Sequence, residues 1–287
     1  NTFLLQEAQR LNTMGFVPKA QLGDIKKQLP VLKSHNTILI RIGFFILGCL
    51  LFSSLTGVIT LFTISLVDSH FTITLFLFTI VGIAASEFLA REQHQFGYGL
   101  DDAFILGSQG FFCATIGMAF ESPLAAFIAL AGIGLTACIR YVHTLSILVS
   151  LIGLTGAICY VVLELKVIDA AFLPFVLLLL ALLLYGAYFK LSRTSAMRYY
   201  SNPMLLLQGF SLVLGYLSMN YLVVRELSES LLELKIAKGQ DIPLAMLFYG
   251  FTFGIPIFYV AYSLYSKNRL MLIIGFLTFG FSIYTIR

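Results

Sequence analysis

Long, uncharged apolar stretches dominate the pattern of hydrophobic and polar positions in this chain. Residues 242–265 hold no charge over 24 positions, residues 203–224 none over 22, and residues 170–189 none over 20. A helix needs about 20 apolar residues to cross a hydrocarbon core of about 30 Å, and it satisfies its own backbone hydrogen bonds in lipid. The pattern therefore predicts an all-α fold, a polytopic transmembrane helical bundle.

Nine stretches fit this description, and merging or splitting one of them would make the count eight or ten. The predicted spans are 42–67, 71–90, 103–120, 122–139, 144–163, 170–189, 203–224, 242–265 and 270–286. Pro123 follows a short connection and is suited to begin a helix. The third and fourth spans are therefore expected to form an antiparallel hairpin. Small residues crowd the fourth and fifth spans, which predicts close packing between helices.

Two amphipathic segments lie outside the spans. Residues 1–36 have apolar positions at helical spacing on both sides of Gly15 and Pro18, which predicts a helical hairpin. The chain is thus divided into this cytoplasmic hairpin (1–36) and a transmembrane bundle (37–287). The hairpin has three possible roles: packing on its own bundle, docking on anionic lipid headgroups, or binding a protein. The outer-surface loop 225–241 is also amphipathic and is interpreted as a lid or a partner-binding element.

Charge sets the expected orientation. Only 11% of residues are charged and 59% are hydrophobic, whereas an ordinary soluble domain is about 25% charged. Thirteen of the 18 Lys and Arg residues fall on the side of the N-terminus, which predicts a cytoplasmic N-terminus. Nine spans then place the C-terminus in the periplasm or outside the cell. The net charge of +4 forms no single stripe, so no nucleic-acid partner is expected.

The chain is numbered from Asn1, which need not be the native start. The first 36 residues are polar and amphipathic, so no signal peptide is expected.

Ionisable residues are rare inside the predicted spans, where they count as functional hypotheses. Arg41 and Glu87 each lie about one turn inside the cytoplasmic end of a span, and Arg91 follows Glu87 at the helical spacing that favours an ion pair. One interpretation is that these charges hold helix ends at the interface. The other is that an Arg41–Glu87 pair bridges the first two spans.

The densest cytoplasmic polar cluster is the loop 91–103. Asp101 or Asp102 is expected to cap the third span, and the alternative is a cation or substrate site built from Glu92, His94 and these two aspartates. No metal or cofactor is expected, because no His-x-x-x-His or Cys-x-x-Cys spacing occurs. The four histidines are His35, His70, His94 and His143. The four cysteines all fall inside apolar segments, where they are interpreted as packing residues.

Known catalytic motifs for nucleophiles, phosphate binding and zinc proteases are absent from the sequence. The chain is therefore predicted not to be an enzyme, although a lipid-modifying activity at the interface stays open. Gln109, Gln208 and Asn220 are the strongest hydrogen-bonding groups inside the spans. They are interpreted as contacts between helices or, alternatively, as the lining of a polar pathway.

Two short patterns suggest a relationship. The first is Leu11-x-x-x-Gly15-Phe16-Val17-x-x-x-Gln21-x-x-x-Ile25, and the second is Gly99-Leu100-Asp101-Asp102-Ala103 at the third span. With the architecture, they resemble a group of uncharacterised bacterial multi-pass proteins that carry only domain-of-unknown-function labels. The resemblance implies a bacterial inner-membrane protein, and it implies no activity and no site residues.

Two functional classes follow from the sequence. The first is a non-catalytic accessory or scaffold subunit that binds partner proteins in the lipid bilayer, which the scarcity of deep charges and the two amphipathic segments favour. The second is a transporter or flippase for an apolar or weakly polar substrate.

Overall fold

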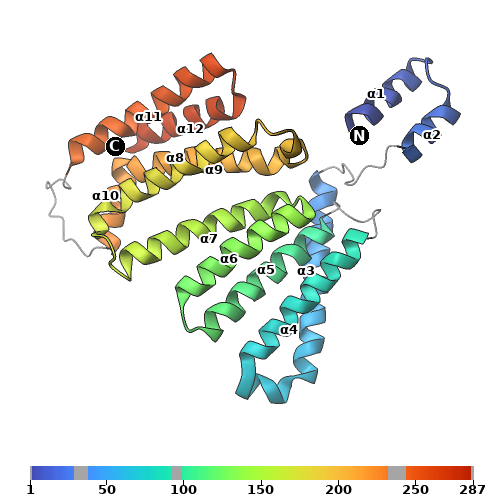
Figure 1. The fold of residues 1–287 in the computed structure, drawn as a ribbon, viewed down its shortest axis with the longest axis horizontal. Helices are drawn as coiled ribbons and strands as arrows, with labels where there is room; N and C mark the ends of the chain where they lie inside the picture. The colour runs from blue at the N-terminus through green and yellow to red at the C-terminus, as the bar shows by residue number, and fades with distance from the viewer. Residues whose placement is uncertain (1, 29–37, 92–98, 232–243, 286–287) are drawn as a thin grey trace. The chain divides into compact units, whose positions relative to one another are not determined.

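The computed structural model describes residues 2–28, 38–91, 99–231 and 244–285, and every regular element among them is a helix (Figure 1). The α-helices are α1 (Thr2–Thr13), α2 (Lys19–Gln28), α3 (Ile38–Phe62), α4 (Ile64–Arg91), α5 (Leu100–Ala119), α6 (Pro123–Tyr141), α7 (Thr144–Leu163), α8 (Leu173–Leu191), α9 (Ser201–Met219), α10 (Tyr221–Leu231), α11 (Ala245–Ser266) and α12 (Arg269–Thr285). Two short 3₁₀ helices, η1 (Ala170–Phe172) and η2 (Ser195–Tyr200), precede α8 and α9.

Six helices in the described part of the chain are long and apolar enough to cross a membrane, and the bent pair α9–α10 makes up to seven. The chain thus has the helices of a multi-pass membrane protein, but the expected count of nine is not confirmed. Three of the nine predicted spans, 103–120, 203–224 and 270–286, are not among the six helices, and the last two differ for visible reasons. The helix α12 has only 17 residues, and the apolar run 203–224 is interrupted at Asn220.

The first connection also differs from expectation. The helix α3 ends at Phe62 and α4 begins at Ile64, so residues 64–67 belong to the second helix rather than the first. Pro174 lies in the first turn of α8 and starts that helix. Pro256 lies inside α11.

A turn separates the two N-terminal helices, but the hairpin predicted over residues 1–36 is not confirmed, and residues 29–36 lie outside the described residues. Gly15 has a φ of +81°, and the N–H of Phe16 donates to the carbonyl of Leu11, which ends α1. The N–H of Leu22 donates to the carbonyl of Pro18, next to the start of α2. How this pair lies on a membrane or a bundle stays a prediction. His35, Glu92, His94 and residues 232–241 of the predicted outer loop fall outside the described residues.

The chain divides into two compact units, Asn1–Phe111 and Phe112–Arg287. The core of the first unit forms around Phe52 of α3, whose ring centroid lies 5.3 Å from that of Phe104 and 5.6 Å from that of Phe111. Gly82 of α4 and Gly107 of α5 provide the space for this ring, because a Cβ at either position would collide with it or nearly so. The absence of two side chains thus lets three helices pack around one aromatic ring.

In the second unit, α6 and α7 pack closely through small residues, as predicted. The hydroxyl of Ser150 on α7 donates to the carbonyl of Ala131 on α6 over 2.8 Å. The Cα of Gly134 faces the backbone of α7, and the Cα of Gly153 faces the backbone of α6. Ser122 caps α6 immediately before Pro123, so this helix begins as the sequence predicts.

The remaining helices of the second unit surround α9. The helix α9 packs against α7, α8, α11 and α12, and α11 packs against α12 (Figure 1). Its buried face includes Leu212 and Tyr216, which cluster with Tyr259 of α11 and Met271 of α12. The same face carries the polar residues described next.

Candidate functional site

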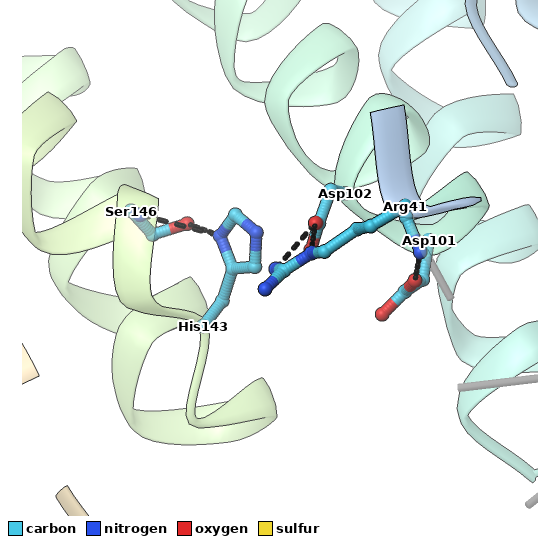
Figure 2. Close-up of polar contacts among 6 residues, drawn as sticks. Arg41, Asp101, Asp102, His143 and Ser146 are labelled. Atoms are coloured by element: carbon cyan, nitrogen blue, oxygen red, sulfur yellow. Dashed lines mark hydrogen bonds and ion pairs between the residues drawn. The ribbon is translucent and has the colours of Figure 1, made fainter. Parts of the chain in front are cut away.

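In the first unit, an ion pair joins α3 to the start of α5. Arg41 donates from Nε and Nη2 to the same carboxylate oxygen, Oδ2 of Asp102, over 2.9 and 2.5 Å (Figure 2). The side chain of Asp102 is 5% exposed, whereas that of Arg41 is 43% exposed. The arginine therefore neutralises a buried carboxylate and reaches the surface with the rest of its guanidinium. Glu87 and Arg91 lie in the last turns of α4, and their predicted pairing stays a prediction.

The other aspartate of this cluster contacts the backbone just before α5. Oδ1 of Asp101, in the first turn of the helix, accepts a hydrogen bond from the N–H of Gly99 over 3.1 Å (Figure 2). The predicted capping of the helix by Asp101 or Asp102 stays a prediction. Gly99 has a φ of +112°, and a Cβ there would collide with the carbonyl oxygen of Arg41. Only glycine fits this conformation and this close approach. The residues of this cluster therefore have structural roles, in an ion pair between helices and in contacts with the backbone before α5.

His143 begins α7, where its ring replaces the usual Ser or Asp cap. Nδ1 accepts a hydrogen bond from the N–H of Ser146 over 3.2 Å and lies 2.7 Å from the Ser146 hydroxyl oxygen (Figure 2). Because a backbone N–H can only donate, Nδ1 is an acceptor and the ring proton lies on Nε2 in the neutral form. His143 is thus a helix cap. Among the described residues, no group of three or more His, Cys, Asp or Glu side chains could hold a metal ion.

The second unit contains a break in an apolar helix. The helices α9 and α10 are together long and apolar enough for one span, but they bend by 66° at Asn220. Asn220 is fully buried, and its Oδ1 accepts from the N–H of Val223, which caps α10. Its Nδ2 donates to the hydroxyl of Tyr216 over 2.8 Å and to Oγ1 of Thr285 over 3.2 Å. One side chain therefore links α9, α10 and α12 at the break.

A chain of hydrogen bonds continues from Asn220 into α11. Tyr216 accepts from Asn220, which leaves its own proton to donate to Oγ of Ser282 over 2.9 Å. Ser282 in turn donates to the carbonyl of Thr252 over 2.6 Å. That carbonyl has no helical donor, because Pro256 four residues later has no N–H. The Ser282 hydroxyl thus replaces the backbone bond that the proline removes.

Thr252 also satisfies the start of α10. Its Oγ1 accepts from the N–H of Tyr221 over 3.0 Å and donates to the carbonyl of Phe248 over 2.8 Å. An N–H at a helix start has no partner within its own helix, so this contact from α11 helps to end one helix and begin the next inside the bundle. At the break, the side chains of Asn220 and Thr252 therefore supply hydrogen bonds to polar groups that the bend leaves without a helical partner.

Gln208 lies two turns before Tyr216 on the same buried face of α9. It is fully buried, and its side chain interacts with the hydroxyl of Tyr185 on α8. Tyr185 in turn neighbours Tyr259 of α11, whose hydroxyl donates to the carbonyl of Leu212 over 3.1 Å. Polar groups therefore extend along α9 from Asn220 to Gln208.

The structure brings together only some of the residues that the sequence singles out. Gln208 and Asn220 share one face of α9, and Arg41, Asp101 and Asp102 share one cluster, whereas Gln109 is buried in the first unit. The sequence analysis missed Tyr216, Thr252, Ser282 and Thr285 as polar partners. A signal existed for Thr252, because a proline inside a span always frees the carbonyl four residues earlier.

The cluster formed by Asn220, Tyr216, Thr252, Ser282 and Thr285 is uncharged, and its members bond to one another and to the backbone. Comparison of the chain with protein-family models, with curated proteins and with solved structures finds no match.

Proposed function

We propose that the chain is a membrane carrier that moves a small, uncharged, weakly polar molecule through its second unit. The observation that supports this most is the break at Asn220. In transporters, interrupted helices place backbone groups and helix ends at the depth where a substrate binds. A helix that only contacts lipid does not need such a break. Here the bend leaves polar groups that require buried partners, and Thr252 and Thr285 supply them.

The absence of charge supports an uncharged substrate. Residues 203–224 and 242–265, which contain the break and its partner Thr252, hold no Asp, Glu, Lys or Arg. Moving an ion through such an interior would leave its charge without a partner, which costs several kcal/mol or more. Hydroxyl and amide side chains supply hydrogen bonds to neutral groups instead.

The other functional class that the sequence favours, an accessory subunit with partner proteins, stays a proposal of its own. The observation that supports an accessory subunit is the amphipathic helix α10, which begins at the break and continues to Leu231. Extraction in mild detergent separates the two classes. Partner polypeptides that co-purify in a fixed ratio support the subunit, and a lone active chain supports the carrier. A bacterial inner membrane with a cytoplasmic N-terminus is the setting that we propose for either.

Cysteine accessibility tests the carrier proposal. In a variant without the native cysteines, Ser211→Cys and Ser218→Cys are placed in turn on the buried face of α9, and Val213→Cys is placed on its 40% exposed face. A charged, membrane-impermeant maleimide is then added to sealed vesicles. Since a thiol reacts as its thiolate, which lipid disfavours, we expect Ser211→Cys and Ser218→Cys to react and Val213→Cys to stay unreactive.

Labelling after denaturation in SDS shows that each thiol is present and intact. Removal of the native cysteines, Cys49, Cys113, Cys138 and Cys159, makes each signal specific to one position. If the two buried-face thiols are as unreactive as Val213→Cys, water does not reach this face and the carrier proposal is wrong.

A further inference from the structure

Three short connections lie at one end of the second unit. They join α6 to α7, α8 to α9 and α11 to α12, and the helices of each pair pack against each other (Figure 1). Near the first two connections, Cys138 of α6, Ile147 of α7 and Leu207 of α9 share one core cluster. The start of α12 lies beside α9 as well, because a Cβ on Gly209 would touch the side chain of Leu270. We name this end, formed by residues 138–147, 188–207 and 264–271, the connection end.

The connection end carries basic residues and no acidic ones. Six of its residues are Lys or Arg, and none is Asp or Glu. The basic residues are Arg140, Lys190, Arg193, Arg198, Lys267 and Arg269. At the opposite end of these helices, Glu121 precedes α6, Glu164 follows α7 and Asp169 precedes α8. The residues of the connection end therefore do not balance their own positive charge.

Four of these basic side chains are open to the surroundings of the protein. Lys190 and Arg193 at the end of α8 are exposed, as are Lys267 and Arg269 on the two sides of the α11–α12 connection. The guanidinium carbon of Arg193 lies 4.0 Å from the ring centroid of Phe189, a contact that attracts a cation to an aromatic face. Arg193 is thus held where charged and apolar surface meet.

Tyrosines and apolar side chains surround these charges. Tyr199 and Tyr265 are 79% and 87% exposed, and exposed tyrosines are typical of the level where headgroups meet the hydrocarbon core. Next to them, Phe189 of α8 and Leu264 of α11 expose apolar surface. From the helix ends inward, the surface therefore changes from basic to tyrosine-rich to apolar.

This order matches a phospholipid better than a soluble polyanion. Basic side chains attract the phosphates of anionic lipids, tyrosines suit the headgroup level, and apolar helix faces suit acyl chains. An acidic protein or a nucleic acid would contact the charges and leave the neighbouring apolar surface uncovered. The chemistry of the whole surface, rather than of the charges alone, thus favours lipid.

We propose that the connection end binds anionic phospholipids. The headgroup phosphate accepts hydrogen bonds from the exposed Lys and Arg side chains of α8 and of the α11–α12 connection, and the acyl chains lie against α8 and α11. The inference is independent of the proposed carrier, because it concerns the end of the bundle and not the break at Asn220.

Lipid quenching of a single tryptophan tests the proposal. The chain has no tryptophan, so one introduced tryptophan reports on the lipid around one position. Tyr265→Trp lies at the connection end and Tyr284→Trp at the other end of α12, and both replace exposed tyrosines. Each full-length variant is reconstituted in phosphatidylcholine nanodiscs that contain a fixed fraction of brominated phosphatidylglycerol or brominated phosphatidylcholine. Bromine on the acyl chain quenches a tryptophan that it contacts, so the ratio of the two quenching constants measures the preference for the anionic headgroup.

We expect the tryptophan of Tyr265→Trp to prefer the anionic lipid by about three- to tenfold. The tryptophan of Tyr284→Trp is expected to show a preference below about twofold, because the basic cluster lies at the other end of its helix. Salt at about 1 M is expected to reduce the preference at the connection end by about half or more, since it screens exposed charges.

Charge removal identifies the residues responsible. In the Tyr265→Trp chain, Lys267→Gln is expected to lower the preference by about half, and Lys267→Gln with Arg269→Gln to lower it below about twofold. Lys166→Gln is the matched control for the lysine. Lys166 and Lys267 are both exposed lysines with a positive φ shortly after a helix, +50° and +54°, so the two substitutions cause similar backbone strain. We expect Lys166→Gln to keep the full preference.

Three results would overturn the inference. The first is equal quenching of Tyr265→Trp by the two brominated lipids, which would leave water or a soluble polyanion as the partner of the basic residues. The second is an equal preference at Tyr265→Trp and Tyr284→Trp. The third is a preference that survives the loss of both Lys267 and Arg269. None of these measurements depends on the reactivity of Ser211→Cys, so the carrier proposal is tested separately.

Discussion

Replacing Gly153 with alanine is expected to lower the free energy of unfolding by about 1–3 kcal/mol. A Cβ at this position would lie 2.5 Å from the backbone nitrogen of Ala131 and 2.8 Å from the carbonyl oxygen of Phe127, both on α6. Backbone atoms cannot rotate away as a side chain can, so α6 and α7 must separate. Separation also weakens the hydrogen bond from Ser150 to the carbonyl of Ala131.

Gly132→Ala is the matched control, because Gly132 lies on α6 as well but a Cβ there meets no atom within 4 Å. Alanine is a better helix former than glycine, so we expect this variant to be as stable as the native chain or slightly more stable. Thermal unfolding in detergent micelles, followed by circular dichroism, measures both variants. Melting temperatures that agree within one degree would show that the close approach of α6 and α7 is not as described.

Asn220→Ala is the second change with a large expected effect, a loss of about 2–4 kcal/mol. It removes the cap on the Val223 N–H and both donations from Nδ2, to Tyr216 and to Thr285. A lost cap costs about 1 kcal/mol, and each lost hydrogen bond between helices in a membrane costs about 0.6–1.7 kcal/mol. The partner groups are buried, so water cannot readily replace what they lose.

Asn268→Ala provides the comparison for this variant. Oδ1 of Asn268 accepts from the N–H of Met271 at the start of α12, so this asparagine also caps a helix. We expect a loss of about 1 kcal/mol there, because only a cap is removed. Equal losses for the two asparagines in the same unfolding assay would mean that the bonds from Asn220 to Tyr216 and Thr285 add nothing.

The sequence predicts local features of this fold well, because they depend on neighbours in the chain. Gly15 and Pro18 mark the turn between α1 and α2, and Pro123 begins α6, as expected. Such signals come from backbone conformation and the missing N–H of proline, which act within a few residues.

Features that depend on distant partners are less predictable. Arg41 pairs with Asp102, 61 positions away, whereas one interpretation of the sequence paired it with Glu87, which lies at a similar depth in the next predicted span. The break at Asn220 lies within an unbroken apolar run, so hydropathy gives no sign of it. Thr252 and Thr285 also bond to groups at the break, and they come from helices that lie later in the chain.

Amide hydrogen exchange in lipid nanodiscs tests the central claim, that the apolar run 203–224 is broken at Asn220 into two helices joined by side-chain hydrogen bonds. The comparison is between residues 217–224 at the break and residues 148–156 in the uninterrupted helix α7. We expect exchange at the break to be at least about tenfold faster than in α7, because local opening needs only the side-chain bonds to part. Equal protection of the two segments would show a rigid, continuous span and would contradict the account.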